Sequence, residues 1–215
     1  MFQSSYYMEY IGRLAGVPYL ISGLLLAVVL ITVGVFYRRN RGKSVARLLA
    51  TLPETYTVFD DVSINSHMGL SQIAHVVVSR HGIFIICEKQ ITGEIFGKET
   101  DQYWTQTKDG DKNKFYNPIR QNYSHIKALE ALLTPLSRLP FVSLVVFPDA
   151  CRLRLSVSGV THYRGLLAEI NKHDKNILTA AEVSVIVSAI RMANLTDRSE
   201  IKKQPRSIQP DKVGQ

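Results

Sequence analysis

The chain has 215 residues, a formal charge of +8 and an isoelectric point near 9.5. This length allows one domain of about 150 residues with extra segments, and the basic balance suits an anionic partner such as a nucleic acid or the inner leaflet of a membrane. Only two cysteines are present, which excludes a disulfide framework and is typical of a reducing compartment.

A long uncharged segment lies near the N-terminus. Residues 14–37 carry no charge, and this stretch is long enough to cross a hydrocarbon core of about 30 Å as a helix. Basic residues crowd the segment 38–43 that follows, whereas only Glu9 and Arg13 precede it. We therefore expect a short extracytoplasmic tail over 1–13, one transmembrane helix over 14–37, and the rest of the chain in the cytoplasm.

One helix pattern and then several strand patterns follow that segment. Apolar residues at helical spacing predict a helix over 43–52, which Pro53 ends. Apolar and β-branched runs predict strands at 56–64, 73–79 and 83–89, with a short fourth strand at 93–97. Residues 109–114, with the sequence DGDKNK, are typical of a hairpin turn or loop.

The second half of the chain shows two helix-start signals. Asn117 precedes Pro118, which is typical of an N-cap with proline at the first helical position. Thr179 and Glu182 form a capping box before the last helix. The other predicted elements are a buried strand at 141–147, an edge strand at 152–158 and a short helix at 163–170. The polar tail over 197–215 is expected to be disordered and basic.

This order of elements predicts an α/β sandwich around a central mixed sheet, within a cytoplasmic domain that spans 38–196. The sequence contains no phosphate-binding GxxxxGK[ST] loop, no GxGxxG, no HExxH and no paired CxxC. Nucleotide hydrolysis, dinucleotide redox chemistry and zinc binding therefore have no support, and no nucleotide cofactor is expected.

Several stretches between residues 42 and 133 resemble, in order and spacing, the nuclease-related domain, usually called NERD. They are SVARLLATL, YTVFDDVSI, SQIAHVVVSRHGIFIICEK, TGEIFG, the region of Trp104, and NPIRQNYSHIKAL. That family is similar to the PD-(D/E)xK nucleases. The resemblance implies a restriction-endonuclease-like α/β/α core, and it fits a bacterial protein anchored in the inner membrane by one helix.

The resemblance also implies a metal site with three acidic positions. Such nucleases hold Mg²⁺ between carboxylates and the scissile phosphate. The second core strand supplies an aspartate in the motif QIDH, and the third supplies an acid and a lysine as E-x-K, on one face because strands have period two. Here Ala74 replaces the aspartate, Cys87 stands at the acid of E-x-K, and the glutamate of the first helix falls near Gly42. Only Lys89 matches.

Loss of the acids at Gly42, Ala74 and Cys87 predicts a module without metal-dependent cleavage and without a resident cofactor. Its expected partners are the membrane and either a nucleic acid or a protein complex. A module that binds only proteins remains an alternative.

An active Mg²⁺-dependent nuclease is the other alternative. It would use Glu88 and Lys89 as catalytic groups, with Asp60 or Asp61 as a further metal ligand. Because Glu88 should point away from Lys89 in a regular strand, this alternative needs a bulge that turns Glu88 inward.

Other side chains are candidates for the same site. Gln121 matches a family position that faces the site, although it also suits a polar helix surface. Lys89 is a candidate phosphate contact, and Trp104, with Tyr103, is a candidate for stacking on a base, unless these rings pack over the sheet. Cys87 with His75 would form a nucleophile pair, but its apolar neighbours favour a buried side chain.

Overall fold

A computed structural model describes most of the chain after the uncharged segment. The described residues are 43–66, 69–134, 136 and 138–201, together with the isolated positions 29 and 32. The expected tail at 1–13, nearly all of the expected transmembrane helix at 14–37, Gly42 and the polar tail after residue 201 lie outside them. Among the described residues, no helix is long and apolar enough to cross a membrane. The chain divides into two units, Met1–Lys43 and Ser44–Gln215, and the fold below is that of the second.

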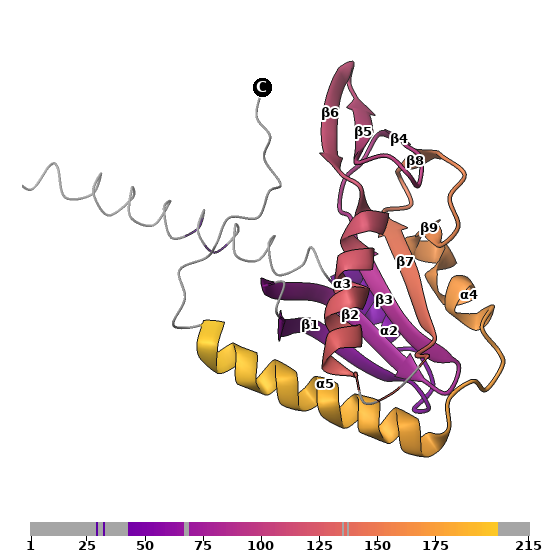
Figure 1. The fold of residues 1–215 in the computed structure, drawn as a ribbon. Coiled ribbons are helices and arrows are strands. Elements are labelled where there is room, and N and C mark those ends of the chain that lie inside the picture. The colour runs from indigo at the N-terminus through magenta and orange to yellow at the C-terminus, as the bar shows by residue number, and fades with distance from the viewer. Residues whose placement is uncertain are drawn as a thin grey trace, which may run out of the picture. The chain divides into compact units, whose positions relative to one another are not determined.

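The main sheet has five strands in the order β1-β2-β3-β7-β9 (Figure 1). They are β1 (Thr57–Ser66), β2 (Gly69–Ser79), β3 (Gly82–Glu88), β7 (Phe141–Phe147) and β9 (Val160–His162). The first three strands pair antiparallel, whereas β7 runs parallel to β3 and β9 parallel to β7. The predicted mixed central sheet is therefore confirmed.

Helices cover both faces of this sheet. They are α2 (Lys43–Leu49), α3 (Pro118–Leu132), α4 (Leu166–Asn171) and α5 (Ala180–Ile201), with a short 3₁₀ turn, η1 (Tyr163–Gly165), before α4. Strand alternation sends Ile83 and Ile85 toward α3 and α5, and sends Phe84 and Ile86 toward α2 and α4. Both faces of β3 are thus buried, which explains its continuous apolar run.

A second, four-stranded sheet has the order β6-β5-β4-β8 and lies at one end of the domain (Figure 1). Its strands are β4 (Glu94–Phe96), β5 (Tyr103–Lys108), β6 (Asp111–Tyr116) and β8 (Arg152–Arg154). The sequence predicted only β4 and β8 of this sheet, and β8 ends at Arg154 rather than at residue 158. The expected loop at 109–114 is mostly strand, because only Asp109 and Gly110, with φ of 53° and 92°, form the turn.

Both predicted helix starts are confirmed. The side chain of Asn117 accepts a hydrogen bond of 2.9 Å from the backbone N–H of Ile119. Thr179 and Glu182 exchange backbone-to-side-chain hydrogen bonds of 2.8 and 3.2 Å. The last helix continues to Ile201, beyond the point at residue 197 where the tail was expected to begin.

Candidate functional site

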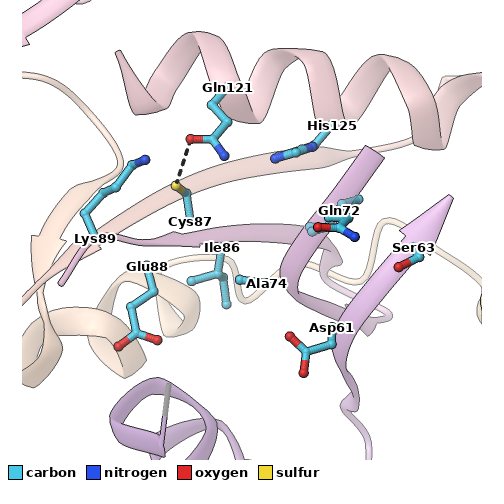
Figure 2. Close-up of a pocket in the computed structure, with 11 residues that line it drawn as sticks. Asp61, Ser63, Gln72, Ala74, Ile86, Cys87, Glu88, Lys89, Gln121 and His125 are labelled. Atoms are coloured by element: carbon cyan, nitrogen blue, oxygen red, sulfur yellow. Dashed lines mark hydrogen bonds between the residues drawn. The ribbon is translucent and has the colours of Figure 1, made fainter. Parts of the chain in front are cut away.

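A cavity of about 440 Å³ opens between the β1–β2 hairpin, the end of β3 and the first turns of α3 (Figure 2). Its lining residues are Asp61, Ser63, Gln72, Ile73, Ala74, Ile86, Cys87, Glu88, Lys89, Gln121 and His125. Six of the positions singled out from the sequence therefore border one cavity: Asp61, Ala74, Cys87, Glu88, Lys89 and Gln121.

An irregular backbone conformation in β1 turns the side chains of two residues toward the cavity. Asp61 has φ of 53°, in the left-handed region, where aspartate is one of the better tolerated residues. Before it, Phe59 packs against the cluster under α3 and α5, and after it Val62 and Ile64 do so. The β1 residues that face α3 and α5 are thus odd-numbered before Asp61 and even-numbered after it. This change leaves Asp61 and Ser63 beside the cavity.

Neutral hydrogen-bonding groups and one ammonium line the α3 side of the cavity. The Cys87 thiol donates to Gln121 Oε1 at 3.8 Å, and His125 Nδ1 is hydrogen-bonded to Ser71 Oγ at 2.7 Å. Burial, with a smaller contribution from the positive charge of Lys89, lowers the pKa of His125 to about 4, so its imidazole is neutral at pH 7. Figure 2 shows the Lys89 side chain on the same side of β3 as Cys87 and Gln121.

The carboxylate of Glu88 lies on the opposite side of β3, as regular strand alternation requires (Figure 2). Tyr163 donates its hydroxyl to Glu88 Oε1 at 2.7 Å, and Gln90 Nε2 donates to the same oxygen at 3.1 Å. The Glu88 side chain is only 6% exposed. No bulge turns it inward, and so the arrangement required by the active-nuclease alternative is not formed.

His75 lies between two carboxylates on that opposite face. Its Nδ1 donates to Asp60 Oδ1 at 2.6 Å, and its Nε2 lies 3.6 Å from Glu88 Oε2. Burial lowers the pKa of His75, but the hydrogen bonds and negative charges of Glu88 and Asp60 outweigh burial, so that the pKa is raised above its usual value. Asp60 and His75 are therefore engaged away from the cavity, and the nucleophile pair of Cys87 with His75 is not formed.

Comparison with known proteins agrees with the motif pattern. The family model described as nuclease-related domain matches residues 38–148. The chain belongs to the NERD family. A protein of Bacillus anthracis that is described as uncharacterized is 35% identical over 173 residues, covering 77% of this chain and 81% of that protein. No solved structure matches this NERD chain at a significant level. The mixed α/β fold with two mixed sheets is in keeping with a nuclease-related domain.

The cavity does not fit the Mg²⁺ ion that a nuclease-related fold implies. Hard cations take oxygen ligands, above all carboxylates. Among the lining residues, Asp61 and Glu88 are the only acids, and Glu88 Oε1 already accepts hydrogen bonds from Tyr163 and Gln90. The ammonium of Lys89 borders the same cavity and opposes a second positive ion. Throughout the described part of the chain, no group of three or more His, Cys, Asp or Glu residues is placed to hold a metal.

Trp104 does not have the position expected of a base-stacking residue. It is fully buried, its indole N–H donates to the Lys98 carbonyl at 2.9 Å, and its ring stacks on Phe147 at 6.5 Å. Neither ring face is open to a nucleic acid, which corrects the expectation for Trp104. The neighbouring Tyr103 points to the other face of β5 and is 41% exposed. Alternation along β5 would have predicted this difference had the strand been recognised.

Proposed function

We propose that this NERD protein is a membrane-anchored module that binds nucleic acid without cleaving it by a metal-dependent mechanism. The composition of the cavity carries this proposal. Ala74 and Cys87 occupy the positions where the family resemblance expects metal-binding acids, whereas Lys89 keeps the cationic group. A site that loses its acids and retains its cation keeps attraction for phosphate and loses the means to hold Mg²⁺.

Within this proposal, each polar group of the cavity has a binding role. The Lys89 ammonium pairs with a phosphate. Gln121 Oε1 is occupied by the Cys87 thiol, which leaves the two N–H groups of its amide to donate to phosphate or sugar oxygens. Gln72 and Ser63 offer further hydrogen bonds along the wall. The formal charge of +8 adds a general attraction for a polyanion.

The location in the proposal comes from the sequence of the N-terminal part. An uncharged run over 14–37, followed by basic residues in 38–43, supports a single-pass anchor with the NERD domain on the cytoplasmic side of a bacterial inner membrane. The domain would then meet nucleic acid close to the membrane surface.

Binding and cleavage assays on the full-length protein in mild detergent test this function. We expect fluorescence anisotropy to show binding of labelled DNA or RNA that weakens as salt is raised, and gels to show intact substrate with Mg²⁺ or Mn²⁺. Lys89→Ala should weaken binding, whereas Lys172→Ala, which removes an exposed lysine paired with Glu169 on α4, should not. Divalent-dependent degradation that Lys89→Ala abolishes would overturn the proposal. Absence of binding at low salt would instead favour a module that binds only proteins.

A further inference from the structure

The outer face of the second sheet is open and carries exposed aromatic rings. Residues paired across neighbouring strands point to the same face, and the registers of β4, β5 and β6 put Phe96, Tyr103 and Tyr116 together. Phe96 is 40% exposed and Tyr103 41%, whereas Ile95 and Trp104, on the inner face of the same strands, are fully buried. The core therefore does not require these two exposed rings.

Basic side chains flank the rings at both edges of this outer sheet face. Lys112 and Lys114 lie on β6 and Arg152 and Arg154 on β8, all in the registers that share the face of the rings. Both strands are sheet edges, and all four side chains are exposed. Glu94, between them, lies 3.5 Å from Arg152 and 3.3 Å from Arg154. Four positive side chains and one carboxylate thus share this face of the strands, which gives it a net positive charge.

A hollow of about 580 Å³ lies over the aromatic part of the face. Phe96, Tyr103 and Arg154 line it, and the loop 98–101 adds one lysine and two carboxylates. Tyr116 packs edge-on against Tyr103, with ring centroids 6.1 Å apart at an interplanar angle of 80°, and so holds that ring in place. A flat group that enters the hollow meets ring faces, a guanidinium and hydrogen-bonding loop groups.

We propose that this outer sheet face binds single-stranded nucleic acid, with bases stacked on Phe96 and Tyr103 and phosphates paired with the basic residues of β6 and β8. Stacking on aromatic side chains needs unpaired bases, because a duplex hides the faces of its bases. Cations on both sides of the rings suit a polyanion that crosses the sheet. The inference rests on the proposed nucleic-acid binding and adds a second contact surface and a preference for single strands.

Anisotropy titrations on the full-length protein in mild detergent test this surface. The probes are a labelled oligothymidylate of about 20 nucleotides and a duplex of the same length. Replacing both rings, as Phe96→Ala with Tyr103→Ala, should weaken oligothymidylate binding at least about tenfold. Tyr123→Ala, which removes a tyrosine that is 61% exposed on α3, is the matched control and should leave binding unchanged.

Charge and shape variants make the result specific. Lys112→Gln with Lys114→Gln should reduce the slope of log affinity against log salt by roughly 1.4, that is about 0.7 for each phosphate contact. The exchange Phe96→Tyr with Tyr103→Phe keeps both rings and should retain binding. Phe96→Leu with Tyr103→Leu keeps apolar bulk without ring faces and should lose it, which tests stacking even where alanine variants fail to fold.

The outcomes separate the two proposals. Equal oligothymidylate affinity for the leucine variant and the wild type, or a wild-type preference for the duplex, overturns the inference. When Lys89→Ala weakens binding and none of the outer-face variants does, the proposed function stands and the inference fails. If the wild-type protein binds neither the oligothymidylate nor the duplex, both proposals are wrong. Ring-dependent binding of phosphatidylserine vesicles without oligothymidylate binding would assign the face to lipid and likewise overturn the inference.

Discussion

Replacing Ala74 by Asp together with Cys87 by Glu should give the cavity a metal site. The β2–β3 register ends with His75 opposite Ile86, so that Ala74 and Cys87 are the next positions across the strands. Both border the cavity, as does Asp61. The double variant therefore brings three carboxylates to one cavity, two of them from adjacent strands. Such a set suits Mg²⁺ or Mn²⁺.

The expected size of the effect follows from binding linkage. A metal at about 100 times its dissociation constant stabilises the folded state by about 2.7 kcal/mol. In a domain of this size, each kcal/mol raises the melting temperature by about 2–4 °C, so saturating metal should raise that of the double variant by roughly 5–11 °C. Without metal, mutual repulsion of the carboxylates should make the double variant melt below the wild type.

Thermal unfolding of the full-length protein, followed by circular dichroism in EDTA, Mg²⁺ or Mn²⁺, measures this shift. Ala74→Asn with Cys87→Gln has nearly the same shape without the charges, and should show no metal response. A wild-type shift as large as that of the double variant would refute the reasoning from the donor set. A double variant that folds but does not respond to metal would refute the assignment of this cavity as the family's metal position.

Three further outcomes follow from contacts elsewhere in the domain. Asn117→Ala removes the N-cap of α3 and hydrogen bonds of 3.0 and 2.7 Å to carbonyls of the loop 98–101. Urea denaturation should therefore show a free energy of unfolding about 3 kcal/mol lower than that of the wild type. The control Asn113→Ala, at an exposed position, should change this free energy by under about 0.5 kcal/mol. The raised pKa of His75 means that its protonated form stabilises the fold below about pH 6.5, and that this contribution is lost as pH rises through the raised value. Urea denaturation across this range should show unfolding free energy falling with pH, and His75→Gln should flatten the fall; a parallel fall in the variant would contradict the assignment. Burial raises the pKa of the Cys151 thiol to about 11, so iodoacetamide at pH 8 should label Cys151 far more slowly in native than in denatured protein, as measured by mass spectrometry.

The main sheet could be predicted from sequence because its strands are buried on two faces. The run from Ile83 to Ile86 has no polar residue, which is typical of a strand covered on both sides. The N-cap at Asn117 and the capping box at Thr179 were equally clear, because the capping residue types are few. Local chemistry and burial agree at all of these positions.

The second sheet and the shape of the cavity could not be predicted in the same way. The outer-face residues of β5 and β6 are threonine, lysine and tyrosine. The sequence of these two strands therefore resembles that of a polar loop until their pairing is known. Asp61 gives no signal for its left-handed backbone, since aspartate is common in many conformations. The switch of facing at Asp61 depends on tertiary packing around β1, so the lining by Asp61 and Ser63 emerges only from the folded domain.

The contacts of Glu88 limit how β3 could bring an acid to the α3 side of the cavity. An acid stands one residue from the E-x-K position, yet sliding β3 by one residue would turn Phe84 and Ile86 to the wrong faces and break the contacts with Tyr163 and His75. The shortest route is new acids at 74 and 87, and either one alone adds a carboxylate without completing a site. A metal site of this kind therefore requires both changes, since a single one carries its cost in repulsion without a bound ion to offset it.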